Sequence, residues 1–146
     1  MLPDWIELCE SFSANGVEFL LVGGQAVIAH GYPRLTKDMD LWVRPTSANG
    51  ERVLRALAAF GAAPEQVLAS QFEDHRTLLV LGREPFRVDI LTDIPGVSFD
   101  EAWRERASVN LDGVDVPLIS KRLLIQNKRA VGRLQDLADA EELDKI

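Results

Sequence analysis

Apolar residues follow two different periods along the chain, and turn residues separate the segments. In residues 3–14 they recur every three or four positions, which predicts an amphipathic helix that Asn15-Gly16 brings to an end. Residues 17–22 form a short apolar run before Gly23-Gly24, which predicts a buried strand. Residues 25–30 leave room for a short helix before Gly and Pro break the pattern.

The remainder of the chain divides in the same way. Short apolar runs predict strands over residues 38–43, 77–81, 86–91, 107–111 and 114–119, with hairpin turns at 82–85 and 112–113. Helical spacing predicts helices over residues 47–60 and 99–106, and a helical C-terminus from Ser120 to about Leu143. In that last segment we expect the buried stripe to consist of Leu123, Ala130, Leu134 and Leu137.

The order of these elements indicates the fold class. Helices and strands do not alternate regularly, as they would in a doubly wound parallel sheet. We therefore expect an α/β (α+β) fold in which helices pack on a mixed sheet and further helices form the C-terminus. A length of 146 residues is typical of one domain, so residues 1–146 are expected to form a single unit.

Composition and charge exclude several classes of function. The longest apolar runs fall well short of the ~18 residues that span a membrane, so no membrane partner is expected. The single cysteine, Cys9, cannot form an internal disulfide, which favours a cytoplasmic setting. The formal net charge of −7 argues against binding of duplex DNA, because a basic surface supplies most of that affinity.

Basic residues nevertheless gather near the C-terminus. Residues 119–133 contain no acidic residue and five basic ones, namely Lys121, Arg122, Lys128, Arg129 and Arg133. The cluster predicts a phosphate site, and the alternative is an ordinary solvated helix face. Lys121 and Lys128 are seven residues apart and should share a helix face, from which we expect both to lean over a cleft.

Three aspartates form the candidate metal site. Asp38 and Asp40 lie two residues apart on a predicted strand, which directs both side chains to one face, ~7 Å apart along the chain. Asp89 lies inside an apolar strand, where a carboxylate is costly to bury without a partner. We do not expect an ion pair with Arg87, because adjacent strand residues face opposite sides. Mg²⁺ shared by the three carboxylates would explain them, whereas solvent-exposed strand ends are the alternative.

The Gly23-Gly24 turn is a candidate phosphate site. It connects a strand to a helix, so it would present free backbone N–H groups, and glycine allows a phosphate to approach closely. Thr36 and Lys37 stand directly before the two aspartates. An ordinary strand-to-helix turn remains the alternative.

At this point the sequence resembles the DNA polymerase beta-type nucleotidyltransferase superfamily. Residues 23–43, GGQAVIAHGYPRLTKDMDLWV, resemble its glycine turn and Asp-x-Asp strand, and RVDIL around Asp89 resembles the strand of its third aspartate. Residues 120–143 resemble the ending of small bacterial members, including nucleotidyltransferases of abortive-infection and toxin–antitoxin systems. Two positions depart from the pattern: Gly24 stands where serine is often found, and Gln135 where many relatives have lysine.

The resemblance implies a function and the residues that carry it. Asp38, Asp40 and Asp89 would hold Mg²⁺, or Mn²⁺, and catalyse transfer of a nucleotide monophosphate from a nucleoside triphosphate to an acceptor hydroxyl. The acceptor would be tRNA, a protein or a small molecule, and a cognate antitoxin protein would be a further partner. A non-catalytic module that binds a nucleotide or a partner is the alternative. The residues implied in phosphate binding are Gly23, Gly24, Thr36, Lys37, Lys121, Lys128 and Arg133.

Overall fold

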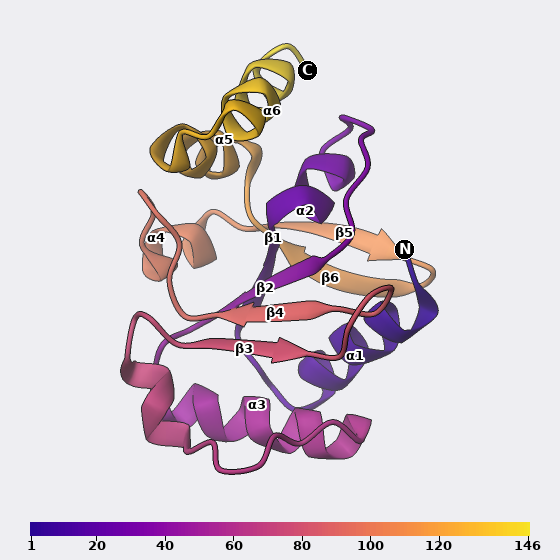
Figure 1. Cartoon of the computed structure of the whole chain (residues 1–146), viewed down its shortest axis with the longest axis vertical. Coiled ribbons are helices and arrows are strands. Elements are labelled where there is room, and N and C mark those ends of the chain that lie inside the picture. The colour runs from indigo at the N-terminus through magenta and orange to yellow at the C-terminus, as the bar shows by residue number, and fades with distance from the viewer.

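A six-stranded mixed sheet forms the centre of the molecule (Figure 1). The computed structural model describes residues 1–146 and orders the strands β3-β4-β2-β1-β6-β5. Strand β1 pairs antiparallel with β2 and parallel with β6, while β2 pairs parallel with β4. The strands are β1 (Phe19–Val22), β2 (Met39–Val43), β3 (Leu78–Leu81), β4 (Val88–Leu91), β5 (Ala107–Leu111) and β6 (Val114–Leu118).

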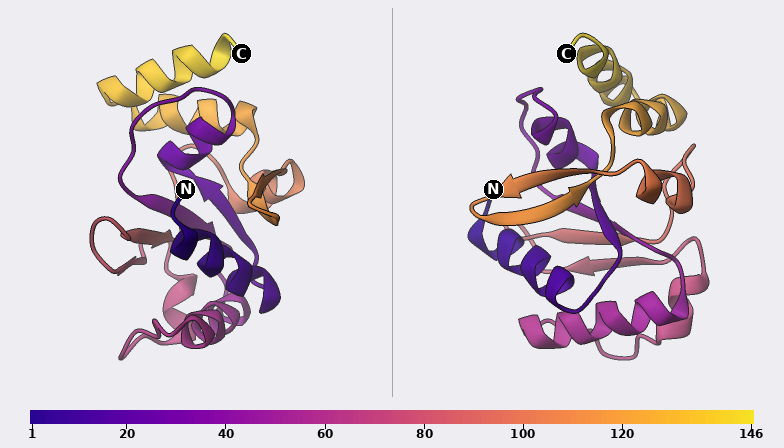
Figure 2. Two further views of the ribbon diagram at one scale, coloured as in Figure 1. Left: turned by 90° about the vertical axis from the view of Figure 1, so that its right-hand side faces the viewer. Right: turned by 180° about the vertical axis from the view of Figure 1, so that it is seen from behind.

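Helices surround this sheet and complete the expected α/β fold, which the structure confirms. Figures 1 and 2 show α3 at one end of the molecule and the pair α5 and α6 at the opposite end. The helical elements are α1 (Pro3–Ala14), α2 (Gly23–Ala29), α3 (Ser47–Phe60), the 3-10 helix η1 (Ala69–Glu73), α4 (Phe99–Arg104), α5 (Lys121–Val131) and α6 (Leu134–Asp144).

The central strands are buried because their residues are apolar on both faces. All four residues of β1 are buried, and in β2 only Asp40 is not fully enclosed. Strands of this kind need cover on both sides, which the helices supply. None of the helices is both long and apolar enough to cross a membrane.

A buried asparagine fixes the junction of β1, β2 and α3. The side chain of Asn49 has no exposed surface, and its amide nitrogen donates to the carbonyl oxygens of Glu18 at 3.0 Å and Arg44 at 3.1 Å. Its amide oxygen accepts from the backbone N–H of Glu18 at 2.9 Å. One side chain thus binds the main chain directly before β1 and directly after β2, where α3 begins.

The C-terminal segment differs from the expected single helical stretch. Gly132 adopts a left-handed conformation with φ of 77°, which ends α5 and redirects the chain into α6. The expected stripe is wrong at three of its four positions: Ala130 is exposed although it lies within α5, and after the break Leu134 is 89% exposed and Leu137 45% exposed. Leu123, in the first half, is fully buried as expected.

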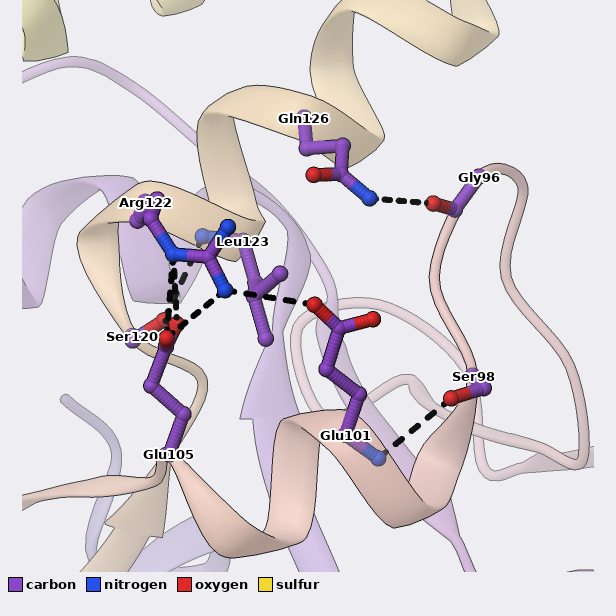
Figure 3. A network of polar contacts seen from close by, with 8 residues as sticks. All are labelled: Gly96, Ser98, Glu101, Glu105, Ser120, Arg122, Leu123 and Gln126. Atoms are coloured by element: carbon purple, nitrogen blue, oxygen red, sulfur yellow. Dashed lines mark hydrogen bonds and ion pairs between the residues drawn. The ribbon is translucent and has the colours of Figure 1, made fainter.

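Polar contacts attach α5 to α4 and to the loop before it (Figure 3). The Ser120 hydroxyl caps α5 by accepting from the N–H of Leu123. Arg122 donates to Glu105 at 2.7 Å and to Glu101 at 3.2 Å. These contacts join the first turn of α5 to α4 and to Glu105, the residue directly after α4.

Replacing Asn49 by alanine should destabilise the fold without changing its architecture. The change removes three hydrogen bonds and leaves the N–H of Glu18 without a partner, whereas the carbonyl oxygens of Glu18 and Arg44 still accept from Arg44 and Thr46. We expect a cost of roughly 2 kcal/mol in the free energy of unfolding. Urea denaturation would measure the loss. Asn110→Ala, an exposed hairpin position, should cost less than about 1 kcal/mol, and an equal loss in both variants would contradict the role assigned to Asn49.

Candidate active site

Two carboxylates stand side by side on neighbouring strands. The parallel register of β2 and β4 pairs Asp40 directly with Asp89. Asp38, two residues before Asp40, belongs to the same face because strand side chains alternate. The predicted grouping on one face of a mixed sheet therefore follows from the register.

Gly23 brings the chain against the Asp40 carboxylate. Strand β1 pairs Val22 with Asp40, so the next residue passes directly over that side chain. Gly23 has φ of 68°, and a Cβ there would lie 2.3 Å from Oδ2 of Asp40. Only glycine satisfies both the backbone conformation and the close approach. The turn and the carboxylate are thus built to fit each other.

The surroundings of Asp40 disfavour its charge. Burial in the central strand raises the pKa of its carboxyl group from 3.8 to about 6, with further contributions from the negative charges of Asp89 and Asp38. Lys128 and Arg87 act in the opposite direction but do not compensate. A cation bound at this carboxylate would reverse the balance.

Arg87 corrects one expectation from the sequence. It pairs with Asp89, with 2.9 Å between Nε and Oδ1, and lies 3.7 Å from Oδ2 of Asp38. The expectation was wrong because Arg87 and Asp89 are two residues apart rather than adjacent, so their side chains share a face. The pairing leaves Asp40 as the least compensated of the three carboxylates.

The donor atoms present fit a hard divalent cation. Oδ1 of Asp38 is buried and has no hydrogen-bond partner, and the neighbouring donors are carboxylate oxygens, which Mg²⁺ prefers. As the side chains lie, however, no group of three His, Cys, Asp or Glu residues is arranged to hold a metal ion. The metal role of Asp38, Asp40 and Asp89 therefore stays a prediction.

A cavity of about 410 Å³ opens beside the carboxylates. Asp38 and Asp40 line it, whereas Asp89, held by Arg87, does not. Most of its lining is polar, and it combines carboxylates on the sheet with basic residues from three other segments. The basic residues are Arg34, Lys37, Lys128 and Arg133. Such a mixture suits a ligand that carries negative charge and is accompanied by a cation.

Gly24 and Thr36 meet within this cavity. A Cβ at Gly24 would lie 2.6 Å from Oγ1 of Thr36 and 3.1 Å from a terminal nitrogen of Arg34. The Thr36 hydroxyl therefore occupies the space that a serine side chain at position 24 would need. The missing serine of the turn is matched by a hydroxyl from the following loop.

The basic cluster of the C-terminus divides between two places. Lys128 and Arg133 line the cavity, as expected. Lys121 does not: its Nζ donates to the carbonyl oxygen of Ile146 at 2.6 Å. The expectation for Lys121 was wrong because a shared helix face is ~10.5 Å long over seven residues, and only one end of it reaches the cavity.

Lys128 is itself buried in an ion-pair network with α6. Its side chain is 7% exposed, and Nζ lies 3.3 Å from Asp136 and 3.1 Å from Asp139. Arg133 pairs with Asp136 at 2.7 Å and Arg34 with Asp139 at 3.1 Å. Burial raises the pKa of the Asp136 carboxyl group, but Arg133 and Lys128 outweigh burial and hold that pKa below its ordinary value.

Arg34, Asp136 and Asp139 were not predicted as residues of the site from the sequence. The two aspartates are spaced three residues apart on one helical face, a pattern common to many surface helices. Gln135 joins the same network by donating to Asp139 at 2.9 Å. What distinguishes Asp139 is its complete burial, with 0% exposure, which the sequence pattern does not reveal.

Lys128→Ala should reduce stability substantially, in contrast to Lys121→Ala on the same helix. Removing Lys128 leaves two buried carboxylates with fewer countercharges, and such a loss costs about 3 kcal/mol. Lys121→Ala removes one surface contact and should change the free energy of unfolding by less than about 0.5 kcal/mol. Chemical denaturation of both variants would test this, and equal effects would speak against the buried network.

Asp40→Asn should stabilise the metal-free protein at alkaline pH. Because the folded-state pKa of Asp40 is raised to about 6, the folded protein binds more protons than the unfolded chain between about pH 4 and 6. The contribution of Asp40 to the free energy of unfolding therefore falls as pH rises from about 4 to 6. Asparagine carries no charge, so the variant avoids this loss. We expect the variant to exceed the native protein by roughly 2 kcal/mol at pH 8 in EDTA and to match it near pH 3.5, where the carboxyl group is protonated in the folded protein and largely so in the unfolded chain.

Urea unfolding at the two pH values would measure this difference. Asp115→Asn, on the exposed β5–β6 hairpin, serves as the control and should show no such pH dependence. A stability difference for Asp40→Asn that is the same at both pH values would rule out charge as its cause.

Known proteins of related sequence or fold identify the family of this chain. A family model described as "Nucleotidyl transferase of unknown function (DUF2204)" matches residues 2–146. No curated protein matches the sequence. The fold is similar to that of the lincomycin-bound lincosamide antibiotic adenylyltransferase LnuA, with TM-score 0.65 and 16% identity over 100% of this chain and 98% of that one.

Two further structures share the fold. The antibiotic-resistance factor ANT(2'')-Ia gives a TM-score of 0.60 and 14% identity over 98% of this chain and 83% of that one. An antigenic nucleotidyltransferase-like protein from Paracoccidioides brasiliensis gives 0.54 and 14% over 97% and 75%. These identities establish a common fold alone, whereas the family model extends over nearly the whole sequence. The chain therefore belongs to this family of nucleotidyl transferases.

Proposed function

We propose that this protein is a Mg²⁺-dependent enzyme that moves a nucleotide monophosphate from a nucleoside triphosphate to an acceptor hydroxyl. The observation that carries the proposal is the pairing of Asp40 with Asp89, with the Gly23 backbone against Oδ2 of Asp40. A carboxylate pair beside a glycine turn and a basic cavity is suited to phosphoryl transfer with metal ions. Family membership supports the same class of reaction.

The triphosphate would lie in the cavity beside the carboxylates. Gly23 and Gly24 begin α2, so their backbone N–H groups lack partners within the helix and are available to phosphate oxygens. Thr36 would add a hydroxyl donor there. Lys37 is exposed and would move onto the phosphates, whereas Arg133, 77% exposed at its side chain, would first have to leave its ion pair with Asp136. Lys128, fixed in its ion pairs, would contribute charge without moving.

The reaction joins the acceptor oxygen to the α-phosphorus and breaks the bond from that phosphorus to the bridging oxygen, releasing pyrophosphate. Asp38 and Asp40 would hold Mg²⁺, or Mn²⁺, which supplies charge neutralisation of the triphosphate and of the leaving pyrophosphate. Asp89, adjacent to Asp40, would share in holding the metal and would help to take the proton of the acceptor hydroxyl on a carboxylate oxygen. For Asp89 to act in this way, its ion pair with Arg87 must first break.

Three classes of acceptor remain for this reaction: the end of a tRNA, a protein, or a small molecule. The structural neighbour LnuA, an antibiotic adenylyltransferase bound to lincomycin, supports a small molecule. The resemblance to toxin–antitoxin members supports tRNA or a protein, with an antitoxin as the controlling partner. Identification of the labelled product separates these cases.

A non-catalytic nucleotide- or partner-binding module is the alternative function. The observation that favours it is the engagement of Asp89 by Arg87, together with the lack of a preassembled three-carboxylate group. Such a module would bind a triphosphate in the cavity and release no pyrophosphate.

Incubation of the purified protein with Mg²⁺ and each α-labelled nucleoside triphosphate should yield pyrophosphate and a labelled acceptor. The arms are protein alone, total tRNA, and a panel of aminoglycosides and lincosamides. Asp40→Asn should lower the transfer rate by at least ~100-fold, because charge neutralisation by metal contributes several kcal/mol to such reactions. Asp115→Asn should retain full activity.

Each outcome leads to a different assignment. Label on tRNA supports a toxin, label on a drug supports antibiotic modification, and label on the protein itself supports protein modification. Nucleotide binding without pyrophosphate release in any arm supports the non-catalytic module. Undiminished transfer by Asp40→Asn would remove the carboxylates from the mechanism.

A further inference from the structure

The guanidinium of Arg87 lies among the carboxylates of the site and supplies a positive charge there. The register of β2 and β4 pairs Asp40 with Asp89, and the N–H of Met39 donates to the carbonyl oxygen of Arg87. Continuing this ladder by one residue pairs Asp38 with Arg87. Since alternate residues share a face, the three aspartates and Arg87 occupy neighbouring positions on one face of these two paired segments.

The guanidinium of Arg87 makes contact with two of those three carboxylates. Its Nε donates to Oδ1 of Asp89 at 2.9 Å, and a terminal nitrogen donates to Oδ2 at 3.3 Å. The same Nε lies 3.7 Å from Oδ2 of Asp38. A two-pronged pair of this kind uses both oxygens of Asp89. Those oxygens are the ones that a shared metal ion would need.

The position of Arg87 also explains why the three carboxylates do not form a ready metal site. Asp89 lies next to Asp40 in register yet contributes nothing to the lining of the cavity. Its carboxylate is 16% exposed and engaged, whereas the side chain of Arg87 is 41% exposed and therefore has room to move outward. The mobile partner of the pair is the arginine.

We propose that Arg87 is a built-in countercation that competes with the divalent ion for Asp89 and Asp38, and is displaced when metal and triphosphate bind together. The inference rests on the proposed function, because it requires the carboxylates to be metal ligands. Displacement costs the guanidinium two partners, so metal alone gains little. A triphosphate supplies new anionic partners for the released arginine. Arg87 thus makes metal binding depend on nucleotide.

Titration with Mn²⁺ alone, followed by electron paramagnetic resonance of the free ion, tests the competition directly. Arg87→Gln should bind Mn²⁺ about two- to fivefold more tightly than the native protein, which corresponds to loss of one partly exposed charged pair. Arg87→Lys, which keeps the charge but loses the two-pronged geometry, should fall between them. Arg83→Gln, an exposed position before β4, should match the native protein.

A second measurement addresses the coupling with nucleotide. A non-hydrolysable triphosphate should strengthen Mn²⁺ binding by a larger factor in the native protein than in Arg87→Gln. The variant has no guanidinium that needs new anionic partners. A merely structural role for Arg87 would lower the melting temperature in EDTA without tightening Mn²⁺ binding. That result, or weaker binding by Arg87→Gln, would overturn the proposal.

Asp40→Asn separates failure of this inference from failure of the proposed function. If Asp40→Asn abolishes Mn²⁺ binding in the presence of nucleotide while Arg87→Gln changes nothing, the metal site stands and the competition is disproved. If neither variant alters Mn²⁺ binding, the carboxylates are not the metal site and both proposals fail.

Discussion

The placement of two carboxylates next to each other in the middle of a sheet is the constraint to which much of the structure responds. Asp40 is on a central strand and Asp89 is its register partner, so neither can turn away from the other. The pKa of Asp40 is raised to about 6, first by burial and then by the charges of Asp89 and Asp38, so ionising this carboxyl group costs free energy in the folded protein. Gly23 and Arg87 are the two local responses: one gives the carboxylate space, and the other supplies positive charge.

The pair of C-terminal helices solves a second problem, which is to bring basic residues to a carboxylate site without letting them neutralise it. Lys128 and Arg34 point at the cavity but are bound to Asp139, and Lys128 also to Asp136. Their charges therefore act on the site at a distance, while Asp40 keeps its oxygens for a ligand. Breaking the C-terminal segment at Gly132 is what allows α6 to fold back and supply those aspartates.

Local patterns in the sequence predicted the elements and the aspartates, because both depend on short-range geometry. Turn residues divided the chain almost where the helices and strands end, and the spacing of Asp38 and Asp40 placed them on one face. The failures concern long side chains and tertiary packing. Lys121 reaches the chain end at Ile146, which no helical wheel reveals. The Arg87–Asp89 pair, by contrast, follows from strand alternation, because residues two positions apart share a face.

The distribution of charge bears on the kind of acceptor that fits this site. The chain is acidic overall, and the basic residues of α5 that face away from the cavity are already neutralised: Arg122 by Glu105 at 2.7 Å and Arg129 by Asp144 at 3.6 Å. A polyanion lying along α5 would have to break these pairs and would face acidic side chains. Of the four basic residues that line the cavity, Lys37 alone has no carboxylate partner. For the proposed transfer reaction, this arrangement of charge favours a small acceptor, or the end of an RNA chain inserted into the cavity, over extended contact with a nucleic acid.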